Sequence, residues 1–430
     1  MAIWRHLRLT SAQGIVAAVT LRARSSARLV QSVPVPSGPA VLELLPDLAR
    51  ALTGDGPVLL PLSAEDPRAG EIARTLGAGE PLGPGEDGPA DGGHADPTAL
   101  VIATSGSTGA PKGVLLNAGA LAASATATET RLGGPGSWLL ALPAWSIAGM
   151  QVLLRAAAAG TEPVVLNAAE SFTAARFLAA ASAVPGPRRY VSLVPTQLRR
   201  VLADPEASAA AAELFDAVLV GGSATPAALL AQARQTGIPV VTTYGMTETC
   251  GGCVYDGRPL DGVTARIADT ASDAEAPAGA LVLSGPMVAR GYRGQPRHPA
   301  FAIPGSFVTA DSGQVRGSGA ATVVTVTGRL DDIIVTGGVK VAPAVVEAAL
   351  LDLPGMRAAV VVGAPDPEWG QAVTAVVAAD RPWDVAAVRA ALAQLPASHR
   401  PRRVLPVDAI PMLPSGKPDR VTARRLAGGG

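Results

Sequence analysis

The sequence is short of the residues that most metal and redox sites use. Only two cysteines and four histidines occur among its 430 residues. Cys250 and Cys253 form a C-x-x-C pair, but a structural zinc site would need two further ligands and the histidines form no paired motif. Nothing around the pair resembles a thioredoxin-like unit. Reduced, packed thiols are therefore the preferred interpretation.

Two further absences narrow the class of protein. No run approaches the roughly 18 apolar residues of a membrane span, although hydrophobic residues make up 48% of the chain and the mean hydropathy is +0.30. Lys and Arg total 35, as do Asp and Glu, so no global field favours nucleic acid or an anionic membrane. Residues 1–30 are too interrupted for a secretory signal. We expect a soluble cytoplasmic protein with no membrane span and no nucleic-acid partner; a homodimer is left open.

What the chain does contain is a loop suited to phosphate. An apolar, strand-like run at 100–103 leads into Thr104-Ser-Gly-Ser-Thr-Gly-Ala-Pro-Lys-Gly113. Glycines let backbone N–H groups approach an anion closely, and the hydroxyls and Lys112 add donors and one positive charge. The spacing matches neither a Walker A loop nor G-x-G-x-x-G. Taken alone, a plain solvated turn is the alternative interpretation of such a loop.

The pattern of the chain predicts an α/β fold. Strands alternate with helices of ten or so residues up to about residue 243, with Asn117 able to cap one helix, and this is typical of parallel sheets covered on both faces. Ligands bind at the carboxyl ends of such strands. The loop at 104–113, Gly221-Gly-Ser223 and Thr243-Tyr-Gly-Met-Thr-Glu-Thr249 all fall there, so we expect them to converge.

After Gly251 the alternation of strands and helices ends. Short strands with Gly, Pro and Asp turns run to about residue 327 and predict a β-rich subdomain. Beyond it, a hairpin, a helix opened by Pro343, two strands and a further helix make a small α+β unit. We therefore expect a large N-terminal domain over residues 1–330 and a small, mobile C-terminal domain over 331–430.

Four separate side chains add to the phosphate loop. Tyr244 offers a flat face on which a nucleobase could stack; the alternative is that its ring only packs in the core. Glu248 can supply one carboxylate to Mg²⁺ that keeps water and phosphate oxygens. Asp311 could accept both hydroxyls of a ribose, or cap a turn. The guanidinium of Arg329 could donate hydrogen bonds to a phosphate or ribose oxygen, or Arg329 could form a surface ion pair.

Together these motifs make the chain resemble the adenylate-forming superfamily of acyl-CoA synthetases, peptide-synthetase adenylation domains and luciferases. The matching stretches occur in the family's order over about residues 98–420, whereas the first hundred residues match little. They are Thr104-Ser-Gly-Ser-Thr-Gly-x-Pro-Lys-Gly113, Tyr244-Gly-Met-Thr-Glu248, Thr309-Ala-Asp311, Gly328-Arg-Leu-Asp-Asp-x-Ile334, Gly337-Gly338 and Pro414-Ser-Gly-Lys417. Ser192-Leu-Val-Pro-Thr-Gln-Leu198 and the stretch from Tyr244 to Gly257 further resemble the 2-succinylbenzoate–CoA ligases of menaquinone biosynthesis.

The resemblance implies ATP, Mg²⁺ and coenzyme A, and it assigns roles residue by residue. Lys417, Thr247 and Glu248 would be catalytic, and Glu248 with Thr108 would hold the metal. The expected ATP-binding residues are Thr104, Ser105, Gly106, Ser107, Thr108, Gly109, Lys112, Gly222, Ser223, Ala224, Tyr244, Gly245, Met246, Thr247, Asp311, Arg329 and Lys417. Lys417 would bridge the attacking carboxylate and the α-phosphate, where a compact ammonium offsets the repulsion of two anions.

The implied mechanism has two steps. A carboxylate attacks the α-phosphate to give acyl-adenylate and pyrophosphate, and the thiolate of coenzyme A then displaces AMP. Relatives are thought to rotate the small domain between the steps. Asp331 is the hinge position by the match, and Gly337, Gly338 and Lys340 would line the path of the thiol.

The acid pocket is where the chain departs from its relatives. They usually carry a histidine pair or an aromatic–histidine pair after the strand that ends near Leu142, and Trp145-Ser146 stands there instead. The expected acid-binding residues are Ser146, Ser192, Arg199, Arg200, Thr249 and Gly251. Either arginine could face the second carboxylate of 2-succinylbenzoate; a solvated helix arginine is the alternative for each.

Three alternatives stay open at the level of the sequence. The enzyme could be a CoA ligase for another aryl or aliphatic acid, or a stand-alone adenylation enzyme that loads a carrier protein. A scaffold that only senses nucleotide is a third alternative, against which the presence of Glu248 and Lys417 argues.

Overall fold

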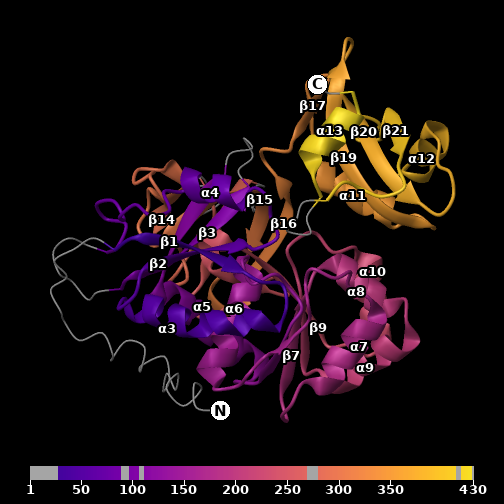
Figure 1. Ribbon diagram of the computed structural model, residues 1–430. Coiled ribbons are helices and arrows are strands. Elements are labelled where there is room, and N and C mark those ends of the chain that lie inside the picture. The colour runs from indigo at the N-terminus through magenta and orange to yellow at the C-terminus, as the bar shows by residue number, and fades with distance from the viewer. Residues whose placement is uncertain (1–27, 89–95, 106–110, 269–278, 413–417, 429–430) are drawn as a thin grey trace.

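The computed structural model describes residues 28–88, 96–105, 111–268, 279–412 and 418–428 (Figure 1). The fold is mixed α/β, with a large part built on three sheets and a small α+β part after it, as the sequence predicted. In the described residues, no helix combines the length and the apolar character needed to cross a membrane.

The first sheet carries the phosphate loop. Its strands, in spatial order, are β1 (Val30–Val35), β2 (Val58–Ser63), β3 (Thr98–Ser105), β4 (Pro111–Asn117) and β14 (Gly291–Tyr292). The first three are parallel, whereas β4 and β14 are antiparallel to their neighbours. Helices α3 (Leu45–Thr53) and α4 (Ala69–Thr75) lie between β1 and β3 in the chain. Residues 104–105 and 111–113, which flank the undescribed part of the phosphate loop, therefore lie in paired strands and are held in register.

The second sheet is the parallel one that the alternating pattern predicts. Its order is β11 (Arg258–Pro259), β10 (Gly251–Tyr255), β9 (Val240–Met246), β8 (Ala217–Val220), β7 (Arg189–Leu193), β5 (Ser137–Leu140) and β6 (Val164–Val165). Strands β5 to β9 run parallel, and β10 and β11 close the edge antiparallel. Strands β5 and β8 are buried at every position, which explains why all their residues except Ser137 are apolar.

Six helices accompany this second sheet. They are α5 (Ala118–Leu132), α6 (Ile147–Ala159), α7 (Ala174–Ala183), α8 (Pro195–Leu202), α9 (Pro205–Leu214) and α10 (Ala227–Gln235). Helices α7 to α10 pack over one face around Phe177, Leu198 and Leu229, and the other face shares a core with the first sheet. The sheet is thus covered on both sides.

The β-rich part follows, as predicted. Four antiparallel strands lie in the order β12 (Thr264–Ile267), β13 (Gly279–Ser284), β15 (Ser306–Arg316) and β16 (Val323–Arg329). Strands β15 and β16 are paired so that Asp311 lies opposite Arg329. That register brings together two residues that are 18 positions apart in the chain.

The last part of the chain has hydrophobic cores of its own. It consists of the hairpin β17 (Ile334–Thr336) and β18 (Val339–Val341), helix α11 (Pro343–Leu351), strands β19 (Met356–Asp366) and β20 (Gly370–Ala379), helix α12 (Val385–Ala391), strand β21 (Arg403–Pro406) and helix α13 (Arg420–Leu426). Two clusters, one around Val346 and Val361 and one around Val360 and Ala423, contain only residues from 334 onward. Figure 1 shows this part, in orange and yellow, standing beside the rest of the molecule.

Several local details differ from the sequence-based expectation. Helices α9 and α13 and strand β21 were not predicted. Asn117 occupies the N-cap position of α5, but its side chain makes no capping bond. Asp96 does so instead, because its Oδ1 accepts from the Gly119 N–H at 2.7 Å. The polar loop after α4 also contains a residue that is almost fully buried, Glu86, which pairs with Arg293.

Candidate functional site

The ends of three parallel strands meet at one edge of the second sheet. Parallel register places the ends of β7, β8 and β9 side by side, with Val220 opposite Thr242, so Gly221 lies next to Thr243 at the start of the stretch 243–249. A Cβ on Gly221 would lie 2.2 Å from Thr243 Oγ1, so only glycine allows this approach. Gly222 has a φ of 83° and is exposed, as are Ser223 and Ala224. These three residues form an open rim beside Tyr244.

Hydrogen bonds from buried polar groups hold the turn after β9 in place. The Met246 N–H donates to Thr249 Oγ1 at 3.0 Å, and this hydroxyl donates to the Gly251 carbonyl at 2.8 Å. Cys250 takes a left-handed conformation, and its carbonyl accepts from Ser124 and Gln151, both at 2.9 Å. The turn is therefore rigid. The structure buries Thr249 completely and engages its hydroxyl with the backbone.

Gly245 shows how tightly β9 and β10 approach each other. A Cβ at this position would lie 2.0 Å from the Gly251 carbonyl oxygen. Thr247 begins the short 3₁₀ turn η2 (Thr247–Thr249) and is 9% exposed. Glu248, next in this turn, is half-buried. Its backbone carbonyl accepts from the Ala289 N–H at 2.8 Å, which ties the turn to the segment before β14.

Glu248 is held by a residue that the sequence analysis missed. The Tyr292 hydroxyl donates to Glu248 Oε1 at 2.7 Å, and Lys112 Nζ lies 5.2 Å from the centre of the Tyr292 ring. Burial, and then the adjacent carboxylate, raise the pKa of Tyr292, so the phenol stays protonated and acts as the donor. Lys112 of strand β4 and Glu248 of the turn η2 are thus joined through one tyrosine side chain. The only sequence signal was a tyrosine four residues before Pro296.

This arrangement suits a Mg²⁺ ion that takes a single protein carboxylate. Tyr292 occupies one oxygen of Glu248 and leaves Oε2 for another partner. Among the described residues, no group of three or more His, Cys, Asp or Glu side chains could hold a metal by itself. Mg²⁺ commonly binds one or two carboxylates and completes its shell with water and phosphate oxygens, so Glu248 fits that chemistry.

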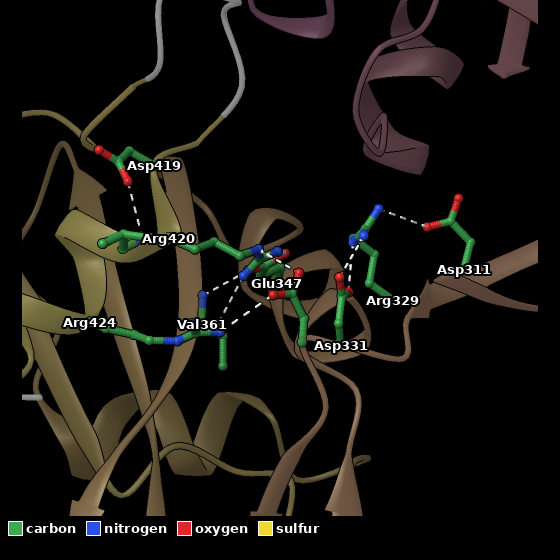
Figure 2. Close-up of polar contacts among 10 residues, drawn as sticks. Asp311, Arg329, Asp331, Glu347, Val361, Asp419, Arg420 and Arg424 are labelled. Carbon is green, nitrogen blue, oxygen red and sulfur yellow. Dashed lines mark hydrogen bonds and ion pairs between the residues drawn. The ribbon is translucent and has the colours of Figure 1, made fainter. Parts of the chain in front are cut away.

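A second polar chain links the other end of the site to the small part of the molecule. The Tyr244 hydroxyl donates to Asp311 Oδ2 at 2.7 Å, and Arg329 Nη1 donates to Asp311 Oδ1 at 3.3 Å. Arg329 also binds Asp331 through Nε and Nη2, at 2.8 and 2.6 Å (Figure 2). The hydrogen bond to Asp331 chiefly raises the pKa of Arg329, so the guanidinium stays charged. Burial, and then Asp311, raise the pKa of Tyr244.

Of the residues expected around the acid, Ser146 lies in the turn between β5 and α6, Ser192 lies in β7, and the two arginines lie on α8, which follows β7. Ser146 Oγ donates to the Pro143 carbonyl at 2.7 Å, which closes the turn between β5 and α6. A Cβ on Gly149 would lie 2.2 Å from that carbonyl oxygen, so the turn packs directly on α6. Ser192 is buried in β7. Arg200 is exposed and donates to the Phe172 carbonyl at 3.0 Å, whereas Arg199 is half-buried.

The residues expected at the thiol path occupy the β17–β18 hairpin. Gly337 and Gly338 form its turn, with φ of 55° and 79°, and Lys340 is exposed. The Gly337 N–H donates to the Trp369 carbonyl at 2.9 Å, and a Cβ on Gly337 would lie 2.4 Å from the Trp369 ring. Arg402 covers that ring at 3.9 Å. The hairpin turn therefore needs glycine for both its conformation and its contact.

Some expected site residues lie outside the described residues: Gly106, Ser107, Thr108, Gly109 and Lys417. The structure describes the residues that flank these two stretches. Thr104 and Lys112 are partners in the β3–β4 register, and Thr104 Oγ1 donates to the Lys112 carbonyl at 3.3 Å. Ser105, the last residue of β3, pairs with Pro111. Met412 and Pro418 form a β-bridge, and the Asp419 N–H donates to the Pro411 carbonyl at 2.8 Å.

Comparison with known proteins adds independent findings. The profile of the AMP-binding enzyme family matches residues 16–293, and that of the AMP-binding enzyme C-terminal domain matches residues 345–417. A probable 2-succinylbenzoate–CoA ligase of Mycobacterium tuberculosis is 43% identical over 404 residues, covering 93% of this chain and 99% of that one. A feruloyl-CoA synthase of an Amycolatopsis species is 35% identical over 359 residues, 77% of this chain and 71% of that one.

Solved structures share the fold. The o-succinylbenzoate CoA synthetase of Bacillus subtilis, in complex with its acyl-adenylate intermediate, superposes with a TM-score of 0.76. The match covers 98% of this chain and 92% of that one at 24% identity. At this identity the likeness concerns the fold alone.

Proposed function

Because the chain belongs to the AMP-binding enzyme family, we propose that it is an ATP-dependent acid–CoA ligase that acts on 2-succinylbenzoate. The single observation that carries the substrate is the relative of 43% identity, since that similarity extends over 99% of a probable 2-succinylbenzoate–CoA ligase. The reaction would have two steps. The acid carboxylate attacks the α-phosphate of ATP and releases pyrophosphate, and the coenzyme A thiolate then attacks the acyl carbon and releases AMP.

The polar chain at Tyr244 supports an adenosine site. Asp311 has one protein partner on each oxygen and keeps lone pairs on both, so it can accept the two hydroxyls of a ribose. Tyr244 would border the adenine together with Gly222, Ser223 and Ala224 of the open rim. The backbone of Gly245 and Met246 would also contact the nucleotide. Arg329 is charged and within reach of the same ribose.

The chain at Tyr292 supports the phosphate end of the site. Lys112 and the glycine-rich loop that precedes it would bind the β- and γ-phosphates, and Thr247 would contact the α-phosphate. Glu248, oriented by Tyr292, would hold Mg²⁺ together with Thr108. The ion would supply charge neutralisation for the departing pyrophosphate. Lys417 would offset the repulsion between the attacking carboxylate and the α-phosphate.

The structure supports an unequal role for the two arginines of α8. Arg200 is exposed and already donates to the Phe172 carbonyl. We therefore assign the second carboxylate of 2-succinylbenzoate to Arg199, and we assign Ser146, Ser192, Thr249 and Gly251 to the rest of the acid pocket. The small domain from residue 331 would pivot at Asp331 and bring Gly337, Gly338 and Lys340 to the thiol.

A pyrophosphate-release assay across a panel of acids tests the substrate. We expect 2-succinylbenzoate with ATP and Mg²⁺ to release pyrophosphate, and added coenzyme A to yield the thioester. Release with ferulate or benzoates but none with 2-succinylbenzoate would reject the substrate. An adenylate that forms without any thioester in the presence of free coenzyme A would indicate a carrier-loading enzyme instead.

The alternative substrate is a different aryl acid, and one comparison favours it. A feruloyl-CoA synthase matches at 35% identity. Ferulate has one carboxylate, so its binding requires no second cation. Arg199→Gln separates the two: the KM for 2-succinylbenzoate should rise while that for a monocarboxylic acid stays unchanged, and equal KM changes for both acids would contradict the assignment of Arg199.

A further inference from the structure

One short segment, residues 289–292, holds both the backbone and the side chain of Glu248. The Ala289 N–H donates to the Glu248 carbonyl at 2.8 Å, and the Tyr292 hydroxyl donates to Glu248 Oε1 at 2.7 Å. Among the described residues, Oε2 of the same carboxylate has no hydrogen-bond partner. The two oxygens of Glu248 are therefore not equivalent, because the protein itself engages one of them and leaves the other for a ligand.

The tyrosine that donates this bond is fixed in its own position. Tyr292 is buried, and on either side of β14 the N–H groups of Arg290 and Arg293 donate to carbonyls of β4 at 2.9 and 2.7 Å. The rings of His298 and Phe301 meet the tyrosine ring edge to face, with centroid distances of 4.7 and 5.2 Å. The hydroxyl therefore cannot follow the carboxylate when the carboxylate turns.

A sheltered ion pair anchors the residue after Tyr292. Arg293 Nη1 pairs with Glu86, and the two side chains are 11% and 6% exposed. Arg293 Nη2 also donates to the Pro81 carbonyl at 2.8 Å, and the Gly294 N–H donates to Glu86 Oε1 at 2.7 Å. Breaking a pair of this kind would leave charges buried without a partner. The position of the phenol is thus set by β4, by β14 and by the loop at 81–86 together.

A carboxylate held in this way distinguishes between the two common divalent cations. Mg²⁺ binds one oxygen of a carboxylate and keeps several waters, whereas the larger Ca²⁺ takes about six to eight oxygens and often both oxygens of one carboxylate. Binding through both oxygens would compete with the Tyr292 hydroxyl for Oε1, but binding through Oε2 alone would not. Since no group of three or more His, Cys, Asp or Glu side chains in the described residues could hold an ion, the choice depends on Glu248.

We propose that Tyr292 is a positioning residue that selects the cation: by engaging Glu248 Oε1 it restricts the carboxylate to binding through Oε2, so that the enzyme prefers Mg²⁺·ATP to Ca²⁺·ATP. The proposal rests on the proposed function, because it presumes that Glu248 holds the ion that accompanies ATP. It goes beyond that function by naming the residue on which the choice of ion depends. Removing a hydrogen-bond partner of a metal-binding side chain typically weakens metal affinity by about 10- to 100-fold.

The test is the affinity of Tyr292→Phe for nucleotide, measured by titration calorimetry without any acid so that no reaction occurs. Phenylalanine keeps the ring and its contacts with Lys112, His298 and Phe301 and removes only the hydroxyl. We expect the affinity for Mg²⁺·ATP to fall about 10- to 100-fold, and that for Ca²⁺·ATP to fall much less, because Ca²⁺ can then take both oxygens. ATP with EDTA should bind both enzymes equally. An unchanged ratio of the two affinities, or an equal loss with metal-free ATP, would overturn the proposal.

Two further variants separate positioning from damage to the fold. Tyr190→Phe is the matched control, because it removes the hydroxyl of another buried tyrosine, near the start of β7, that donates to two backbone carbonyls at 3.0 and 2.9 Å. It should leave the affinities for both metal–nucleotide complexes unchanged. In a Glu248→Gln background, Tyr292→Phe should cause no further loss of Mg²⁺·ATP affinity, since the carboxylate being positioned is gone; an additive loss would overturn the proposal. A wild-type enzyme that adenylates no acid of the panel would instead reject the proposed function.

Discussion

Substituting Asp311 by asparagine gives the sharpest test of the adenosine site. The Asp311 side chain is 12% exposed, and each of its carboxylate oxygens already accepts one hydrogen bond from the protein, from Tyr244 and from Arg329. A carboxylate offers about four acceptor positions, so two remain for the hydroxyls of a ribose. Asparagine keeps one carbonyl oxygen and replaces the other by a donor. The substitution should therefore affect ribose recognition more than any other part of the nucleotide.

The magnitude follows from the bonds that change. One charge-assisted bond to the ribose is lost and the other becomes a neutral bond. Hydrogen bonds to charged groups contribute about 1.5–3 kcal/mol and neutral ones about 0.5–1.5 kcal/mol. A combined loss of about 2–3 kcal/mol corresponds to roughly 30- to 150-fold weaker ATP binding. The maximal rate of adenylation should change much less, because the ribose lies away from the reacting atoms.

The assay is acid-dependent pyrophosphate exchange as a function of nucleotide concentration, with ATP and with 2′,3′-dideoxy-ATP. The wild-type enzyme should prefer ATP strongly, and Asp311→Asn should lose most of that preference. Asp380→Asn, an exposed aspartate of the small part, is the control and should keep it. If Asp311→Asn discriminates between the two nucleotides as well as the wild type does, the ribose is bound elsewhere and the reasoning fails.

Three further predictions concern other parts of the molecule. Lys417→Ala should reduce adenylation by about 100- to 1,000-fold while calorimetry shows unchanged ATP binding; retained adenylation would mean that its role is misassigned. Gly337→Ala places a Cβ 2.4 Å from the Trp369 ring at a φ of 55°, so thioester formation should fall while adenylate formation persists, and equal loss of both steps would place the effect outside the thiol path. Burial raises the pKa of Cys253 to about 12 and also raises that of Cys250. Both thiols therefore stay protonated at pH 8, and iodoacetamide should label neither in the native enzyme but both after unfolding, as mass spectrometry would show.

The parts of the fold that the sequence predicted were those with strong local signals. The buried strand β8 is apolar throughout, β5 is apolar after Ser137, and Pro343 marks the first turn of α11. The helices that were missed carry weaker signals. Asp204-Pro205 caps and opens α9, but this helix begins directly after α8 ends. Asp419 caps α13, a helix of 7 residues. Among the described residues, strand β21 pairs with one neighbour, β20, and it is 4 residues long.

Long-range pairing limited what the sequence could predict about the site. Asp311 and Arg329 could be named individually, but their contact depends on the β15–β16 register. Tyr292 was missed because it gains its partner Glu248 only when β14 joins β4, a pairing between strands that are far apart in the chain. The same holds for Arg420, whose partners Asp332, Glu347 and Val361 lie 59 or more positions earlier. A tertiary pairing of this kind leaves no local pattern.

The adjacency of Asp331 and Asp332 has a consequence for insertions and deletions in this chain. Both residues lie in one turn, but they form ion pairs with different elements: Asp331 pairs with Arg329 of β16, and Asp332 pairs with Arg420 of α13. Inserting a single residue between them would pull one carboxylate off its arginine, whichever way the turn relaxed. Tolerance to insertion depends on the burial and hydrogen bonding of the segment affected. The exposed turn at Gly319 can therefore vary in length, whereas the step from Arg329 to Asp332 works as a fixed spacer, and its length matters as much as its residues.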